Sequence, residues 1–256
     1  NQLGALLADY ILGTHKRNGT MPKKPAFVKT IVTTELQRKI AEEYGAECYD
    51  TLTGFKYIGE KIREFESMPD GPDYLVGGEE SYGYLVNTEV RDKDAVSAAT
   101  MTAECALYHA SEGRTLFDQL RVLWKKHGYY QETLISKTFK GEAGLKKMNE
   151  LMDSLRKNPP EVFAGQPLQM IRDYQNGSTW YVKEKQTRKD IALPSSNVLQ
   201  FVLQDGSIVT ARPSGTEPKI KFYASCRSDV LDGLDNAISS VRKKIDAITD
   251  ALNRID

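Results

Sequence analysis

The chain has 256 residues, the length of one or two ordinary domains. Its 35 Lys and Arg residues balance 35 Asp and Glu residues, which argues against a nucleic-acid-binding protein with a basic surface. No apolar run approaches the roughly 18–20 residues of a membrane span, and the three scattered cysteines form neither a disulfide framework nor a zinc motif. We therefore expect a globular cytoplasmic protein with no nucleic-acid or membrane partner.

The first half of the chain alternates helix-like and strand-like segments. Helices are predicted from the first residues onward and at 34–44, 57–66, 94–109 and 115–126, and strands at 26–32, 47–50 and 73–76. Thr34 and Gln37 have capping-box spacing, and Asp94 and Thr115 are the expected N-caps of two later helices. Repeated β–α units predict a domain with a mainly parallel α/β sheet over residues 1–127.

The pattern changes near Gly128. Strands are predicted at 129–140, 171–174, 179–182, 197–203, 207–212 and 219–226, and helices at 141–157 and from about Asp229 onward. Asp205-Gly206 between two apolar runs predicts a hairpin with a two-residue turn, and residues 183–194 are expected to form a surface loop. We expect a smaller α+β domain over residues 128–256, with an antiparallel sheet and a C-terminal helix.

The last predicted helix carries apolar residues three and four positions apart between Leu231 and Ile255. This spacing is found in dimerising coiled coils, which makes an interaction module one hypothesis for the chain. The same spacing is normal for a helix that packs one face on its own sheet, and we favour that interpretation.

The segment Arg212-Pro213-Ser214-Gly215-Thr216-Glu217-Pro218 follows a predicted strand. A phosphate group needs several hydrogen-bond donors that converge without steric bulk. Gly215 would let backbone N–H groups approach, Ser214 and Thr216 add hydroxyls, Arg212 adds a planar fork, and Lys221 lies close behind. The alternative is an ordinary turn with a solvated arginine, which the composition by itself favours.

Two other segments follow predicted strands, where α/β sheets usually bind ligands. In residues 77–84, Glu79 and Ser81 offer an acceptor and a donor for vicinal sugar hydroxyls, and the alternative is a flexible glycine-flanked loop. Thr53-Gly54 precedes a predicted helix, whose first N–H groups attract anions or hydroxyl oxygens, and the alternative is a simple strand-to-helix turn.

Residues 91–94 contain Lys93 between two aspartates. Lys93 is either a solvated surface lysine or a proton donor and electrostatic stabiliser beside a phosphoryl group. The motifs H-E-x-x-H and G-x-S-x-G are absent from the sequence, and its closely spaced aspartate pairs are too sparse for a Mg²⁺ loop. We expect no metal site in this chain.

Taken in order, these segments resemble the α-D-phosphohexomutases, the family of phosphoglucomutase and phosphomannomutase. Residues 1–7 resemble the start of that family's third domain. Thr53-Gly54-Phe55-Lys56 resembles the T-G loop of that domain. Gly78-Glu79-Glu80-Ser81 resembles its G-E-x-S loop, and Arg91-Asp92-Lys93-Asp94 resembles its R-x-K-D segment. Residues 212–221 resemble the fourth-domain phosphate loop. The resemblance spans nearly the whole chain and implies that residues 1–127 and 128–256 are the third and fourth domains.

The resemblance also implies a role for each matching residue. Lys93 would assist proton transfer at the hydroxyl that is phosphorylated. The residues that would bind the sugar are Thr53, Gly54, Glu79 and Ser81, and those that would hold the non-reacting phosphate are Arg212, Ser214, Gly215, Thr216 and Lys221. Lys221 replaces an arginine that is common at that position, which keeps the charge but loses the bidentate fork.

The family's phosphoserine lies in an S-H-N-P-like loop and its Mg²⁺ in a D-x-D-x-D-R loop, and neither string occurs in this sequence. We therefore expect the C-terminal half of an enzyme that interconverts hexose 1-phosphate and hexose 6-phosphate through hexose 1,6-bisphosphate. This half would be inactive without the missing N-terminal domains, and the helical start at Asn1 agrees with a chain cut from a longer one. A stand-alone sugar-phosphate-binding protein and a parent acting on pentose phosphates are the alternatives, and the choice between glucose and mannose stays open.

Overall fold

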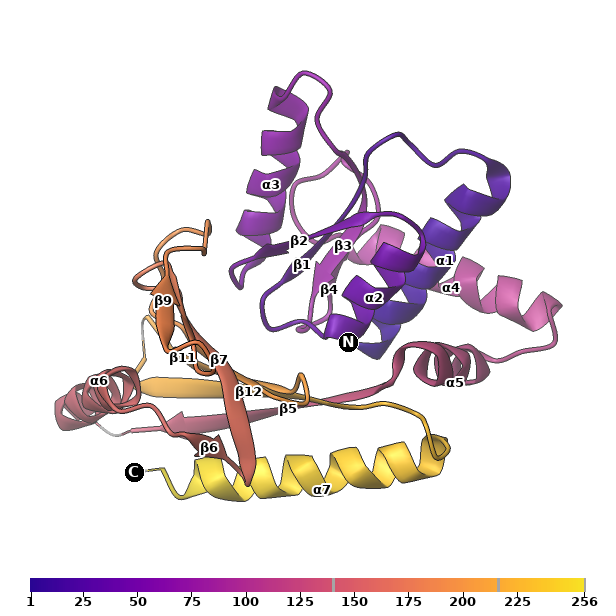
Figure 1. The fold of residues 1–256 in the computed structure, drawn as a ribbon. Coiled ribbons are helices and arrows are strands. Elements are labelled where there is room, and N and C mark those ends of the chain that lie inside the picture. The colour runs from indigo at the N-terminus through magenta and orange to yellow at the C-terminus, as the bar shows by residue number, and fades with distance from the viewer. Residues whose placement is uncertain (140, 216, 256) are drawn as a thin grey trace. The chain divides into compact units, whose positions relative to one another are not determined.

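The computed structural model describes residues 1–139, 141–215 and 217–255, and it divides into two compact units (Figure 1). The units are Asn1–Gly128 and Tyr129–Asp256, so the second is as long as the first and not smaller as expected. Within the described part of the chain, no helix combines the length and the apolar character needed to cross a membrane.

The first unit contains five helices and four strands in its described residues. The helices are α1 (Gln2–Asn18), α2 (Glu35–Glu43), α3 (Phe55–Ser67), α4 (Ala95–Ser111) and α5 (Leu116–His127). The strands are β1 (Pro25–Thr30), β2 (Glu47–Thr51), β3 (Asp73–Glu79) and β4 (Gly83–Leu85). Their order in the sheet is β2-β1-β3-β4, with β1 parallel to both β2 and β3, and β4 antiparallel to β3. This confirms the mainly parallel α/β sheet.

Every residue of β1 is buried, because helices cover both faces of this sheet. The helix α3 lies on one side of the sheet, and α1 and α4 lie on the other (Figure 1). On the α3 side, Ala26 and Val28 of β1 pack with Ile58 and Ile62 of the helix. The predicted caps are largely confirmed: the Thr34 side chain accepts from Leu36 N, Asp94 caps α4, and Thr115 with Asp118 forms a full capping box. The Gln37 side chain instead donates to Asn1 O, so α2 has no capping box.

The sequence suggested that Gly77 and Gly78 belong to a loop after the third predicted strand, but both lie within that strand. Strand β3 continues through Gly77 and Gly78 to Glu79 and turns into β4, which was not predicted. A Cβ at Gly77 would lie 2.3 Å from the carbonyl oxygen of Val28, and one at Gly78 would lie 2.6 Å from that of Gly83. Glycine is therefore required here because neighbouring strands approach too closely for a side chain.

The second unit consists of an eight-stranded antiparallel sheet and two helices in its described residues. The strands are β5 (Tyr129–Thr138), β6 (Val162–Phe163), β7 (Gln166–Asp173), β8 (Ser178–Tyr181), β9 (Gln186–Arg188), β10 (Leu199–Leu203), β11 (Ile208–Pro213) and β12 (Lys219–Ser228). The helices are α6 (Gly141–Lys157) and α7 (Leu234–Asn253). The sheet order is β5-β12-β11-β10-β7-β8-β9, and β6 pairs with β7. This confirms the expected α+β architecture.

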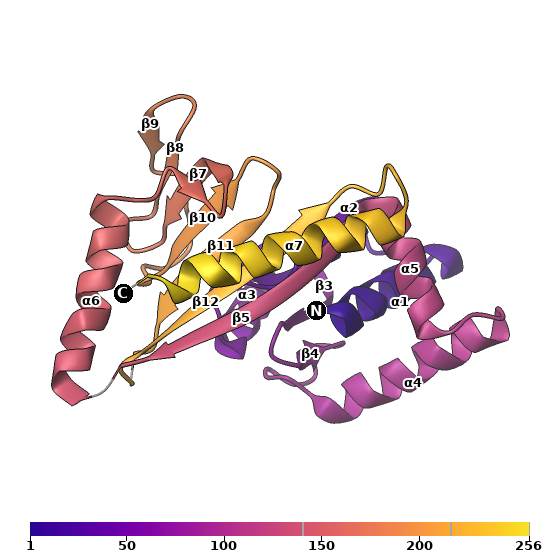
Figure 2. The same cartoon turned by 90° about the horizontal axis from the view of Figure 1, so that it is seen from below.

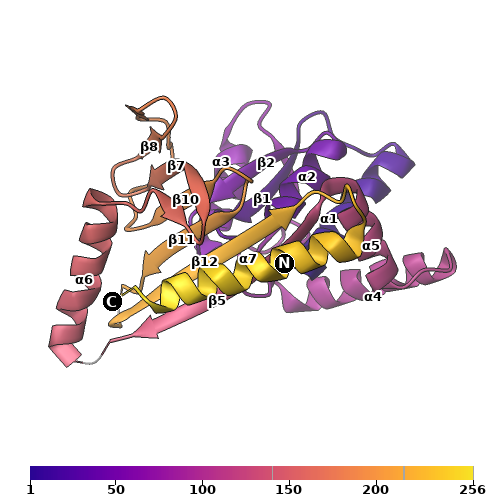
Figure 3. The same cartoon turned by 60° about the horizontal axis from the view of Figure 1, so that its bottom comes forward.

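The helix α7 runs along β5 and β12 (Figures 2 and 3). Its apolar stripe is buried in the unit itself, with Val241, Ile248 and Leu252 fully covered. The stripe therefore serves the core, as the favoured interpretation expected. The helix begins at Leu234 and not near Asp229, because Gly233 adopts a positive φ of 96° before the first turn, and Leu231 lies outside the helix with 87% of its surface exposed.

Two further predictions for the second unit differ in outcome. The hairpin at Asp205-Gly206 forms, with Gly206 at a φ of 83°, but Val202 pairs with Ile208 and Leu203 N donates to Ser207 O, so its loop is one residue longer than the two predicted. The predicted surface loop at 183–194 contains strand β9, which pairs with β8. All three residues of β9 are exposed, so this strand has no apolar alternation from which it could have been predicted.

Candidate functional site

The start of helix α3 is the centre of the candidate site in the first unit. Thr53 and Gly54 connect β2 to this helix, and Gly54 is its N-cap residue with a φ of 118°. The first backbone N–H groups of a helix have no partner within the helix and attract hydroxyl oxygens or anions. Phe55, the first helical residue, is buried, and two other predicted segments of the site lie against it.

Glu79 reaches Phe55 because its cross-strand partner is a glycine. Glu79 pairs with Gly83 at the β3–β4 turn. A Cβ at Gly83 would lie 2.9 Å from both Cγ and Oε1 of Glu79 and 3.1 Å from Cδ2 of Phe55. The half-buried carboxylate thus lies over Gly83 and beside the Phe55 ring. Phe55 and Gly83 were not among the predicted site residues, although both lie within the segments that predicted the site.

The environment of Glu79 changes its acidity. Burial raises the pKa of the Glu79 carboxyl above its ordinary value, and the neighbouring Glu80 adds to the increase. The hydrogen bond from the Ser81 side chain and the charge of Lys93 lower the same pKa without cancelling the effect of burial. Ser81 and Lys93 therefore stabilise the ionised form of Glu79, the form that accepts hydrogen bonds from hydroxyl groups.

Replacing Ser81 by alanine is expected to raise the pKa of Glu79 further, because the carboxylate loses a donor that stabilises its charge. The pKa can be followed by ¹³C NMR of the Glu79 side-chain carboxyl during a pH titration. Ser81→Thr is the matched control, since it keeps the hydroxyl and should keep the pKa. An unchanged Glu79 pKa in Ser81→Ala would show that the hydroxyl does not act on the carboxylate.

Lys93 comes to the same place through a close packing of its loop on α3. A Cβ at Gly59 would lie 2.7 Å from the carbonyl oxygen of Arg91, so only glycine lets this loop approach the helix. Lys93 Nζ lies 5.9 Å from the centre of the Phe55 ring and 3.1 Å from Asp92 Oδ1. Its side chain is 54% exposed, which leaves the ammonium accessible to a ligand. The structure thus brings Gly54, Glu79 and Lys93 together around Phe55.

A charge cluster built around a fully buried lysine lies beside this site. Lys29 of β1 is fully buried, with Nζ 2.7 Å from Glu35 Oε1 and 2.9 Å from Asp50 Oδ1. Arg38 also contacts both carboxylates, with Nε 2.8 Å from Glu35 Oε2 and Nη2 2.5 Å from Asp50 Oδ2. Two cations and two carboxylates therefore neutralise one another.

The cluster fixes the edge of the sheet that carries Glu79. Lys29 is the strand partner of Gly78, and the hydroxyl of the next residue, Thr30, donates to Glu80 Oε2 at 3.1 Å. A lysine as the sole charged residue of the predicted strand at 26–32 was the sequence signal that could have revealed this cluster.

The candidate phosphate-binding residues of the second unit lie at one end of β11 and β12. Arg212 and Lys221 are direct cross-strand partners. Their neighbours Ala211 and Phe222 are fully buried, whereas both cations are partly exposed, so the cations point to the opposite face of the sheet. Among the described residues, no carboxylate forms an ion pair with either cation. Like charges directly opposite each other destabilise a sheet, and an anion bound between them would remove the repulsion.

The turn that follows Arg212 presents its backbone to solvent. Ser214 N donates to Lys219 O at 2.7 Å, and Ser214 Oγ accepts from Glu217 N at 3.3 Å, which closes the turn. Gly215 is exposed, and no atom lies within 4 Å of the position that a Cβ would occupy. A phosphate oxygen can therefore approach the backbone there. Thr216, the remaining predicted contact, lies outside the described residues.

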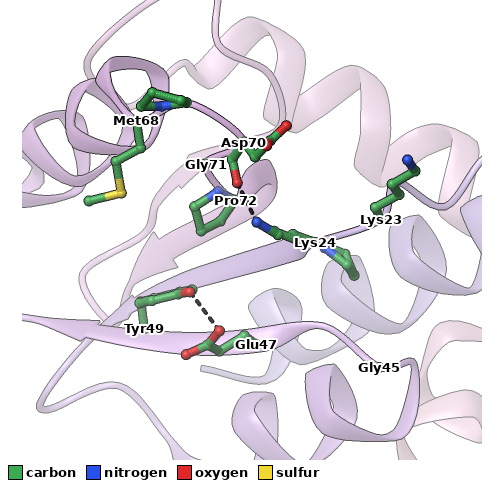
Figure 4. A pocket seen from close by; sticks show the side chains of 11 residues that line it. Lys23, Lys24, Gly45, Glu47, Tyr49, Met68, Asp70, Gly71 and Pro72 are labelled. Atoms are coloured by element: carbon green, nitrogen blue, oxygen red, sulfur yellow. Dashed lines mark hydrogen bonds between the residues drawn. The ribbon is translucent and has the colours of Figure 1, made fainter.

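An open pocket of about 540 Å³ lies at the opposite, amino-terminal edge of the first unit's sheet (Figure 4). Its polar groups largely satisfy one another: Lys24 Nζ donates to Asp70 O at 2.6 Å, and Tyr49 OH donates to Glu47 Oε2 at 2.6 Å. It contains none of the predicted site residues. We therefore do not include it in the candidate site.

The described residues offer no set of side chains suited to a metal ion. In the portion that the structure describes, no group of three or more His, Cys, Asp or Glu side chains could hold a metal ion. The two aspartates that flank Lys93 are already used, since Asp94 caps α4 and Asp92 accepts from Lys93. The described residues thus do not fit a Mg²⁺ ion, and we assign no catalytic step of this chain to a metal.

Comparison with known proteins identifies the family. The model described as "Phosphoglucomutase/phosphomannomutase, alpha/beta/alpha domain III" matches residues 1–127, and "Phosphoglucomutase/phosphomannomutase, C-terminal domain" matches residues 164–233. The chain belongs to the phosphoglucomutase/phosphomannomutase family. This confirms the resemblance seen in the sequence.

Curated relatives of this family match along nearly the whole chain. The phosphoglucomutase of Staphylococcus haemolyticus is 37% identical over 238 residues, and that of Staphylococcus aureus (strain USA300) is 35% identical over 241 residues. The matches cover 93% and 94% of this chain but 42% of each relative. The chain therefore spans less than half the length of these phosphoglucomutases.

Solved structures of the family share the fold. The open form of parafusin from Paramecium, a phosphoglucomutase, has a TM-score of 0.60 at 18% identity and covers 98% of this chain and 41% of its own. A phosphoglucomutase/phosphomannomutase family protein from Burkholderia thailandensis has a TM-score of 0.54 at 14% identity, over 99% of this chain and 42% of its own. At this level of identity, the match supports the fold alone.

Proposed function

We propose that this chain is the substrate-recognition half of a mutase that interconverts hexose 1-phosphate and hexose 6-phosphate. In the first unit, Thr53, Gly54, Glu79 and Ser81 bind sugar hydroxyls, and Lys93 assists proton transfer at the reacting hydroxyl. In the second unit, Arg212, Ser214, Gly215, Thr216 and Lys221 hold the phosphate that does not react. The cytoplasm, a reducing compartment, is the proposed location, in keeping with three free cysteines.

The cross-strand pair of Arg212 and Lys221 is the observation that carries this proposal. Two facing cations cost stability unless an anion is bound, and the exposed Gly215 turn adjoins them. Arg212 can hold two phosphate oxygens in its planar fork, while Lys221 contributes a single charge. Such a site suits a tetrahedral dianion better than a carboxylate, because it offers donors from more than one direction.

In the first unit, the arrangement suits a polyhydroxylated ring. The Glu79 carboxylate can accept from two adjacent hydroxyls, and the Ser81 hydroxyl can donate as well as accept. Lys93 carries its charge to the same Phe55 ring, where it can stabilise charge that develops on a hydroxyl oxygen. These are positioning and charge-stabilising roles, which contribute most of the catalysis in phosphoryl transfer.

The family resemblance assigns the remaining chemistry to parts that this chain lacks. A phosphoserine would exchange its phosphoryl group with the sugar phosphate through hexose 1,6-bisphosphate, and Mg²⁺ would neutralise charge on the transferred group. Both belong to the N-terminal domains of the proposed parent.

The purified chain is therefore expected to bind glucose 6-phosphate but not to convert glucose 1-phosphate, even with Mg²⁺ and glucose 1,6-bisphosphate present. Isothermal titration calorimetry measures the binding, and a coupled dehydrogenase assay measures the conversion. Mannose 6-phosphate and ribose 5-phosphate, titrated in parallel, test the sugar preference. Turnover by the chain would contradict the division of roles, and an absence of binding to all three ligands would contradict the recognition function.

A further inference from the structure

Tyr82 occupies a backbone conformation that disfavours its side chain. Residues 80–82 form the loop between Glu79 and Gly83, which are strand partners. Three-residue hairpin loops place a left-handed residue at the last position, where glycine is the usual choice. Tyr82 has a φ of 67° at this position. A side chain with a Cβ is strained in this region.

The Tyr82 side chain gains little from folding. It is 86% exposed, the second-highest value among the exposed large hydrophobic residues that the structure describes. The nearby Tyr84 is buried and contributes to the core. Tyr82 thus combines a strained backbone, which lowers the stability of the unliganded fold, with an aromatic ring that stays in water and offsets none of that cost. Residues with such strain concentrate at ligand-binding sites.

The position of Tyr82 relates it to the candidate sugar-binding residues. It follows Ser81 directly, and Gly83 after it is the residue over which the Glu79 carboxylate lies. A pyranose ring presents hydroxyls around its rim and C–H groups on its faces. Carboxylate and hydroxyl groups recognise the rim, whereas an aromatic ring buries the apolar face. The described contacts of the site supply the first kind of group, and Tyr82 would supply the second.

We propose that Tyr82 is a sugar-contacting residue whose ring packs on the C–H face of the hexose that Glu79 and Ser81 hold. This inference rests on the proposed function and adds a specificity element to it. The loop keeps a strained tyrosine because the ligand, and not the fold, benefits from the ring. The consequence is that stability and binding respond to substitution in opposite directions.

Tyr82→Gly tests this directly. Glycine relieves the strain and adds some freedom to the unfolded chain, so the melting temperature of the first unit should rise by roughly 3 °C. The chain has two tryptophans, so in a Trp180→Phe background the fluorescence of Trp124 reports unfolding of the first unit. In titration calorimetry, the Kd for glucose 6-phosphate should rise about fivefold.

Two controls separate the ring from the backbone. Tyr82→Phe keeps the ring and should keep the affinity and the melting temperature. Lys185→Gly makes the same relief of strain in the second unit, since Lys185 has a φ of 51° in the turn before β9. It should leave glucose 6-phosphate binding unchanged.

Unchanged binding in Tyr82→Gly, beside a wild-type chain that binds, would overturn this inference and leave the proposed function intact. A lower melting temperature in that variant would also overturn it, since Tyr82 would then serve the fold. If the wild-type chain binds no hexose phosphate, the proposed function fails first, and this inference fails with it.

Discussion

Replacing Lys29 by methionine is expected to destabilise the first unit by about 3 kcal/mol, the lower end of the cost of removing one partner from a buried ion pair, because the Glu35 and Asp50 side chains left behind are 28% and 31% exposed. The Lys29 ammonium is fully buried between Glu35 and Asp50. Methionine fills a similar volume but leaves two carboxylates with Arg38 as their only cationic partner in the described cluster. The free energy of unfolding can be measured by denaturant titration, followed by Trp124 fluorescence in the Trp180→Phe background.

The pH dependence of stability provides a second measurement of the same cluster. Burial would raise the pKa of Glu35, but Lys29 and Arg38 outweigh this effect and lower it to about 2, from an ordinary value of 4.5. A carboxyl with a lowered folded-state pKa contributes stability that is fully present above pH 4.5 and is lost as the pH falls towards 2. In Lys29→Met, this loss should be smaller and should occur nearer the ordinary pKa.

Lys39→Met is the matched control for this variant. Lys39 directly follows Arg38 of the cluster in the sequence, but its side chain is half-exposed and pairs with the half-exposed Glu42 at 3.1 Å. Removing such a surface pair should change the free energy of unfolding by less than about 1 kcal/mol. If Lys29→Met costs no more than Lys39→Met, the charge cluster does not stabilise the sheet edge.

The elements that could be predicted from sequence are those whose local signals agree. Helix α5 has a capping box, an apolar stripe and a following glycine, and its bounds match within one residue. Strand β9 has exposed residues throughout, so nothing in its pattern separates it from a loop. The start of α7 depends on the positive φ of Gly233, which places the first helical residue after the start predicted near Asp229. Local pattern thus predicts well where burial is periodic and poorly where a turn conformation decides.

The candidate site shows the same limit on a larger scale. Its residue types could be predicted, because a phosphate or a sugar requires particular donors and acceptors. Their mutual placement could not, because it depends on close approaches far apart in sequence. The absence of a side chain at Gly59 lets the Arg91 carbonyl approach α3, and its absence at Gly83 lets the Glu79 side chain lie beside Phe55. Arg212 and Lys221 lie opposite each other only in the observed strand register. A change of register by one residue would move every side chain of a strand to the other face of the sheet.

Replacing Arg212 by alanine is expected to weaken glucose 6-phosphate binding by about 10–100-fold, because a charge-assisted, bidentate contact contributes about 1.5–3 kcal/mol. The same change should leave the fold as stable as before or slightly more stable, since it removes a like-charged cross-strand pair with Lys221. Titration calorimetry measures the affinity, and Trp180 fluorescence in a Trp124→Phe background measures the stability of the second unit.

Two control variants show whether the loss of affinity in Arg212→Ala is specific to that position. Arg212→Lys keeps the charge but loses the fork, so its affinity should lie between those of the wild type and Arg212→Ala. Arg188→Ala removes the same charge from β9, where the arginine pairs with Glu184 and packs on Tyr181. It should bind as the wild type does. Equal losses of affinity in Arg188→Ala and Arg212→Ala would mean that the net charge of the protein attracts the phosphate. A loss of affinity confined to Arg212→Ala requires a specific phosphate-binding site at Arg212, since a diffuse electrostatic field does not distinguish two arginines of one sheet.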